Sequence, residues 1–128
     1  MHRMLYIDRS ITDINVKDST LYDYTALHYQ ARYGTTGSVA WLLRQDPPPD
    51  IDIQDSYEQL TSLMAAVRSD KDSEGKVRLL LDHGADRNLK HKDGDTALSM
   101  ARYANKNPAV IDMLENYRPD VSRYNNKI

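Results

Sequence analysis

Residues that could bind a metal are present in the sequence, but their spacing does not assemble a site. The four histidines never lie three or four residues apart, the spacing that places two ligands on one face of a helix. There is no cysteine, so thiolate metal sites, disulfides and a cysteine nucleophile are excluded. Two acidic clusters raise the question of calcium: Asp50, Asp52 and Asp55, and Asp70, Asp72 and Glu74. We expect solvated loops instead, since the first cluster falls on an extended segment rather than in a calcium-binding loop.

Catalytic motifs are equally unsupported. The glycine-containing stretch 34–37 lacks the lysine and the preceding strand of a phosphate-binding loop. Ser38 and Ser99 could act as nucleophiles only beside a positioned base, and the repeat described below already accounts for both positions. The sequence therefore predicts no enzyme, no cofactor and no metal site.

Size and composition describe one soluble domain. The chain has 128 residues, of which 40% are hydrophobic and 28% charged. A formal net charge of -2 gives no general attraction to nucleic acid or to anionic membranes. No apolar run approaches the roughly 20 residues that span a bilayer, and the first residues carry no apolar segment of the secretory kind. We expect a cytoplasmic protein with neither nucleic-acid nor membrane partners.

The elements that would position any functional residue recur along the chain. A Thr-Xaa-Leu tripeptide begins at Thr25, Thr61 and Thr96, at spacings of 36 and 35 residues. Each copy is followed by a predicted helix rich in small residues and then by a second, apolar helix. The second helices are expected over 38–45, 75–83 and 108–117. Extended polar spans lie between the copies, over 50–60 and 86–95.

This order of elements resembles the ankyrin repeat family. In the segment LLLDHGADRNLKHKDGDTAL, the Leu-Leu-Leu, Gly-Ala-Asp, Asn, Asp-Gly and Thr-Xaa-Leu elements keep the family's order and spacing. Thr25-Ala26-Leu27-His28 is the nearest copy of the family's Thr-Pro-Leu-His. The resemblance covers nearly all of residues 5–117. It implies an all-α fold, an ankyrin-type solenoid of helix-turn-helix repeats joined by short β-hairpins.

The resemblance also implies a division of the chain. Its parts are a leading half repeat or N-terminal cap (1–18), repeat one (19–53), repeat two (54–89), repeat three or C-terminal cap (90–117) and a frayed tail (118–128). The half repeat is either a genuine cap or the edge of a longer array, and the sequence leaves both open. Apolar Met4, Leu5 and Ile7 at this end predict self-association or an attached neighbour.

Local signals predict how the helices end and pack. Thr25, Thr61 and Thr96 should cap the first helices, Asn107-Pro108 should start the last helix, and Gly84 should end a helix in the left-handed conformation. Buried alanines should let the first helices approach one another closely. In the family the equivalent of His28 is structural, and His91 is expected to be exposed on a hairpin. Residues 68–75 form a turn about two residues longer than is usual in the family.

For function, the resemblance implies a non-catalytic module that binds a protein partner in a concave groove lined by hairpin tips and first helices. The partner-binding positions are Tyr24, Arg32 and Tyr33 in repeat one, Tyr57, Glu58 and Arg68 in repeat two, and Lys92, Asp95 and Tyr103 in repeat three. Tyr and Arg are enriched at binding hot spots, and a mixture of charges suits a protein better than a phosphate backbone.

Alternatives to this interpretation stay open. Tyr33 and Tyr103 could equally be half-buried packing residues. The chain could be a structural or assembly segment of a larger ankyrin protein. It could also be an immunity-type inhibitor that blocks one enzyme through the same groove.

Overall fold

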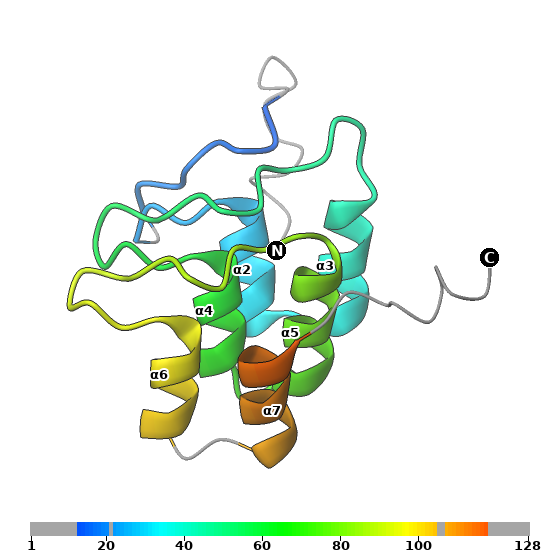
Figure 1. Ribbon diagram of the computed structural model, residues 1–128. Helices are drawn as coiled ribbons and strands as arrows, with labels where there is room; N and C mark the ends of the chain where they lie inside the picture. The colour runs from blue at the N-terminus through cyan, green and yellow to red at the C-terminus, as the bar shows by residue number, and fades with distance from the viewer. Residues whose placement is uncertain (1–12, 21, 105–106, 118–128) are drawn as a thin grey trace.

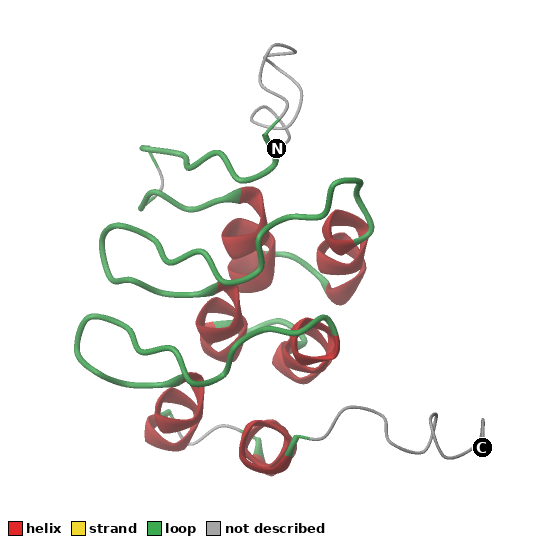
Figure 2. Cartoon of the chain, turned by 45° about the horizontal axis from the view of Figure 1, so that its top comes forward, coloured by secondary structure: helices red, strands yellow, loops and turns green. Residues whose placement is uncertain are grey.

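Helices stacked in two rows form the body of the protein (Figure 1). The computed structural model describes residues 13–20, 22–104 and 107–117. Its helices are α2 (Ala26–Tyr33), α3 (Thr36–Leu43), α4 (Ser62–Arg68), α5 (Ser73–Asp82), α6 (Ala97–Tyr103) and α7 (Pro108–Asn116). Helices α2, α4 and α6 pack in one row and α3, α5 and α7 in the other, with the connecting loops projecting to one side (Figure 2). The predicted all-α fold of paired helices is confirmed.

Each helix of the first row begins at a threonine cap. The side chains of Thr25, Thr61 and Thr96 accept hydrogen bonds from the backbone N–H three residues further on, which satisfies a donor that the helix itself cannot. Asn107 caps α7 by accepting from the Ala109 backbone N–H, two residues further on, and Pro108 occupies the first turn. These predicted starts are confirmed. Gly84, after α5, has a φ of 90°, as a left-handed helix end requires.

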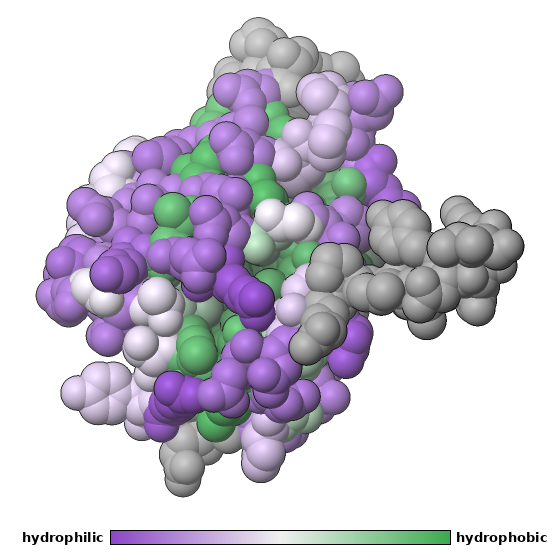
Figure 3. Space-filling view, in the orientation of Figure 1, coloured by the Kyte–Doolittle hydropathy of each residue, from purple (hydrophilic) through white to green (hydrophobic). Residues whose placement is uncertain are grey.

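The core runs between the two rows. The first row buries large side chains, Leu27, Leu63, Met64, Val67 and Met100, together with the alanines Ala31, Ala65, Ala66 and Ala101, whose small size lets neighbouring helices approach closely. The second row supplies valine, leucine and methionine: Val39, Leu42, Leu43, Val77, Leu80, Leu81, Val110, Met113 and Leu114. The face in Figure 3 is mostly hydrophilic, with smaller apolar areas between the polar ones. Stacking therefore buries the apolar faces that a single helix pair would leave in water.

A buried histidine joins the first two helix pairs. The Nε2 atom of His28 lies 2.8 Å from the Leu60 carbonyl oxygen, and its Nδ1 atom lies 3.1 Å from the Thr25 backbone nitrogen. The first partner accepts and the second donates, so the neutral imidazole carries its proton on Nε2. Burial is the main reason that the pKa of His28 lies below its ordinary value. His28 is structural, as predicted.

Hydrogen bonds between side chain and backbone link consecutive loops. The side-chain oxygen of Asn15 accepts from the Asp50 backbone N–H at 2.8 Å, and that of Asp52 accepts from the Asp86 N–H at 2.9 Å. In addition, the side chains of Asp13, Asp50 and Asp86 each accept from the N–H two residues ahead. This ladder of bonds holds each loop in register with the next.

The expected β-hairpins take the form of loops without strands in the part of the chain that is described. A backbone hydrogen bond joins the two sides of each loop: Asp18 N–H to Tyr24 O, Asp55 N–H to Leu60 O, and His91 N–H to Asp95 O, at 2.8, 3.0 and 3.0 Å. Near the tips, Asp23, Gln59 and Gly94 have positive φ angles of 59°, 61° and 90°. The tight reversal leaves one cross-loop pair, which is too few for a strand ladder.

The long turn between α4 and α5 is held by a buried lysine. Lys76 is fully buried, and its Nζ atom donates to the Gly34 carbonyl oxygen at 2.8 Å and to Ser69 Oγ at 2.7 Å. Equivalent second-helix positions hold the smaller residues Ser38 and Ala109. Lys76 therefore fills the space beneath the longer turn and ties it to the first helix pair.

We predict that stability falls in acid because of His28. The unfolded histidine takes up a proton near pH 6.5, whereas the folded one resists protonation to lower pH. The free energy of unfolding should thus be lost as pH drops below about 6.5, by up to about 1.4 kcal/mol per pH unit. Urea denaturation at pH values from 7.5 to 5 measures the free energy of unfolding. This free energy should change less steeply with pH for His28→Gln than for the wild type. Equal slopes would show that another group causes the loss.

A second prediction concerns Lys76. Lys76→Met keeps the aliphatic stem but leaves the Gly34 carbonyl without its donor, which should cost about 1–3 kcal/mol. The matched control is Lys71→Met, since Lys71 is exposed on the same turn and its replacement should stay within about 0.5 kcal/mol of the wild type. Urea denaturation followed by circular dichroism measures both. Equal stability of the two variants would contradict the role given to Lys76.

Candidate functional site

Among the described residues, the exposed aromatic side chains other than Trp41 on α3 lie at the loops or at the ends of the first-row helices. Tyr22, Tyr33 and Tyr57 expose 53%, 43% and 58% of their surface. The rings of Tyr22 and Tyr57 meet edge to face, with centroids 6.0 Å apart. This contact places the tips of two successive loops side by side. Since large exposed aromatics are unusual in a protein with so polar a surface, they are candidate contact residues.

A half-buried arginine lies beside these rings. Arg32, in the last turn of α2, donates from Nη1 to the Tyr24 hydroxyl at 3.1 Å, and its guanidinium carbon lies 5.5 Å from the centre of the Tyr33 ring. Burial opposes the charge of Arg32. The hydrogen bond and electrostatic interaction with Tyr24, together with smaller contributions from Tyr33 and Glu58, outweigh it, so the pKa of Arg32 is raised. The arginine is thus fully charged and held in one place.

The second helix pair contributes an ion pair. Arg68 Nη1, in the last turn of α4, lies 3.2 Å from Glu58 Oε1 on the preceding loop, and both side chains are half-exposed. Arg32 and Arg68 occupy the same position, seven residues after Thr25 and Thr61. Neighbouring repeats therefore present the same cation on one side of the molecule. We call Tyr22, Arg32, Tyr33, Tyr57, Glu58 and Arg68 the Tyr–Arg surface.

The structure corrects one of the predicted binding residues. Tyr24 is only 2% exposed, so it cannot lie open in a groove. Its ring stacks on His28 with centroids 5.2 Å apart, and burial raises the pKa of its hydroxyl. Leu60, the equivalent residue before Thr61, is also buried, and both residues close their loops through their own carbonyls. Tyr24 supports the surface by holding Arg32.

Of the residues predicted from the third repeat, Lys92 contacts the Tyr–Arg surface through its backbone. Tyr103 is 84% exposed and Lys92 is exposed, while the backbone N–H of Lys92 donates to the Glu58 carbonyl at 2.9 Å. Asp95 is half-buried, and its backbone N–H donates to His91 Nδ1 at 3.2 Å. His91 was expected to be exposed and is instead buried, because it takes the place in its loop that Asp55 takes in the loop before.

One residue of the surface was missed in the sequence. Tyr22 stands three residues before Thr25, where Glu58 stands before Thr61. Extending the repeat alignment to the first loop would have found it. Met4, Leu5 and Ile7, predicted to form an associating end, lie outside the described residues, as does the predicted tail.

Comparison with known families decides what kind of repeat this is. The model for ankyrin repeats (3 copies) matches residues 3–91 and 27–125, which together span most of the chain. The chain belongs to the ankyrin repeat family. Ankyrin repeats are in general protein–protein interaction modules. No curated protein matches the sequence.

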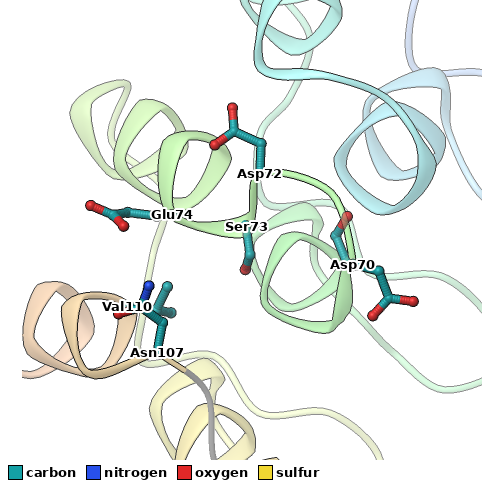
Figure 4. A pocket seen from close by; sticks show the side chains of 7 residues that line it. Asp70, Asp72, Ser73, Glu74, Asn107 and Val110 are labelled. Atoms are coloured by element: carbon teal, nitrogen blue, oxygen red, sulfur yellow. The ribbon is translucent and has the colours of Figure 1, made fainter.

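Other sites considered from the sequence find no support in the described residues of this ankyrin protein. Ser69, Asp70, Asp72, Ser73, Glu74, Asn107 and Val110 line a hollow of about 390 Å³. The acidic side chains around it point in different directions (Figure 4), and Asp72 accepts a hydrogen bond from Thr36. Among the residues described, no group of acidic and histidine side chains could hold a metal. No helix within these ranges is long and apolar enough to cross a membrane.

Chemical modification should separate the buried tyrosine from the exposed ones. Tetranitromethane attacks accessible phenolates, so we expect nitration of Tyr57 and Tyr103 and none of Tyr24, whose pKa is raised and whose ring is buried. Peptide mass spectrometry gives the extent at each site. The same reaction in urea is the control and should modify Tyr24 as well. Nitration of Tyr24 in the folded protein at the rate of Tyr57 would contradict its burial.

Proposed function

We propose that this ankyrin protein is a non-catalytic module that binds a protein partner through the Tyr–Arg surface. The observation that carries the proposal is the contact between exposed rings on successive loops, Tyr22 and Tyr57, beside two arginines held by neighbouring side chains. Rigid aromatic and arginine side chains lose little conformational freedom on binding, which is why they dominate the energy of many interfaces.

The charge distribution favours a protein over nucleic acid as the partner. Arg32 and Arg68 lie with Glu58 on the same surface, and the chain carries a formal net charge of -2. A phosphate backbone would require a more uniform positive surface. Lys92, Asp95 and Tyr103 would extend the contact onto the third repeat, within the repeat boundaries 19–53, 54–89 and 90–117. A cytoplasmic location, in keeping with a sequence without cysteine, belongs to the same proposal.

The test is affinity capture with a double substitution. Tyr57→Ala with Arg68→Ala should reduce recovery of a partner from the native cell by at least about ten-fold, because both side chains would be hot-spot residues. Recovery is measured by quantitative mass spectrometry of the captured proteins.

The matched control replaces one aromatic residue and one arginine on the second-row helices, by Trp41→Ala with Arg78→Ala. Both residues are exposed, so this variant should capture the partner as the wild type does. Circular dichroism melts confirm that both variants fold. Equal capture by the wild type and by the folded Tyr57/Arg68 variant would exclude the Tyr–Arg surface as the binding site.

A further inference from the structure

The Arg32 guanidinium lacks a carboxylate partner within the described residues. It forms no ion pair there, whereas Arg68 pairs with Glu58 and Arg102 pairs with Glu115. Its Nη1 atom is engaged by an uncharged hydroxyl, that of Tyr24. A charged group that has already lost part of its water and forms no direct ion pair can still gain from a carboxylate placed against it.

The position of Arg32 is nevertheless fixed. The Tyr24 hydroxyl accepts its hydrogen bond from one side, and the Tyr33 ring lies against it at 5.5 Å. Tyr24 is itself immobilised by burial and by stacking on His28. A guanidinium held in this manner has N–H donors left over and little side-chain entropy to lose, so a ligand could bind to it at low cost.

The local charge defines what such a ligand carries. Glu58 is near enough to raise the pKa of Arg32, but its carboxylate is already paired with Arg68 at 3.2 Å. Arg32 and Arg68 together carry two positive charges against the single negative charge of Glu58. One further negative charge would neutralise the group. A dianionic phosphate would meet the repulsion of Glu58, whereas a single carboxylate would balance the set and match the planar fork of the arginine.

We infer that the Tyr–Arg surface binds a partner segment in which an Asp or Glu carboxylate pairs with Arg32 and an apolar side chain packs beside it on Tyr22 and Tyr57. This inference rests on the proposed function and adds the chemistry of the partner. The aromatic pair supplies apolar contact area, and the arginine sets the register of the segment.

The probe is a set of immobilised degenerate decapeptide pools with the central residue fixed as Glu, Gln, Lys or phosphoserine. The wild type should be retained on the Glu pool about ten-fold more than on the Gln pool, the difference expected for one charge-assisted pair. Retention on the Glu pool should fall between 50 mM and 500 mM NaCl more steeply than on the Gln pool.

The matched variants are Arg32→Gln and Arg78→Gln. Arg78 is exposed on α5, so its replacement should keep the preference for Glu, while Arg32→Gln should abolish it. If Arg32→Gln does not fold, the test is the salt dependence of wild-type retention: retention on the Glu pool must fall more steeply with NaCl than retention on the Gln pool. Equal retention on the Glu and Gln pools, a preference for phosphoserine or Lys, or retention on no pool would overturn the inference. Loss of cellular partner capture by the folded Tyr57/Arg68 variant would meanwhile leave the proposed function standing.

Discussion

The burial of α4 between its neighbours is the constraint on which the rest of the structure depends. All of its residues from Ser62 to Val67 are buried, because α2 and α6 cover its flanks and α5 its back. A seven-residue helix is too short to persist in water alone, so the stack forms as a cooperative unit in which each pair stabilises the next. Arg68, at the end of α4, is the residue of this helix that reaches solvent, and it is the one that pairs with Glu58. The same packing that makes the core therefore determines which side chain is offered for recognition.

Much of this fold could be predicted from the sequence, because the signals that specify it are local and repeated. Thr25, Thr61 and Thr96 act as caps whatever surrounds them, and Gly84 ends α5 through its own backbone freedom. How far individual side chains are buried from solvent could not be predicted in the same way. Tyr24, Leu60 and Asp95 share one position in the repeat, yet Tyr24 and Leu60 are buried and Asp95 is only half-buried. All three loops close through the carbonyl of this residue, so the difference in burial depends on the packing around each side chain rather than on its position in the repeat.

In the candidate site too, the repeat pattern predicts where residues lie but not which side chains contact each other. The resemblance to ankyrin repeats, mapped along the repeat register, predicted that Arg32, Tyr33, Tyr57, Glu58 and Arg68 share a side of the molecule. It could not show that Glu58 pairs with Arg68 rather than Arg32, since the choice depends on rotamers and on distances across two loops. Lys76 is a similar case: a lysine on an apolar helix gives no sequence signal of burial. Its acceptors come from two separate segments, Ser69 on the longer turn and Gly34 at the end of α2.

The bonds from Asn15 to Asp50 and from Asp52 to Asp86 have a geometric consequence for recognition. Each joins a side chain of one loop to the main chain of the following loop. Together they fix the distance between successive loops. The exposed side chains at the loop tips lie outside these bonds, which fix the spacing of the loops themselves. Side chains at the tips could then be exchanged to suit a different ligand without altering the spacing at which they are presented.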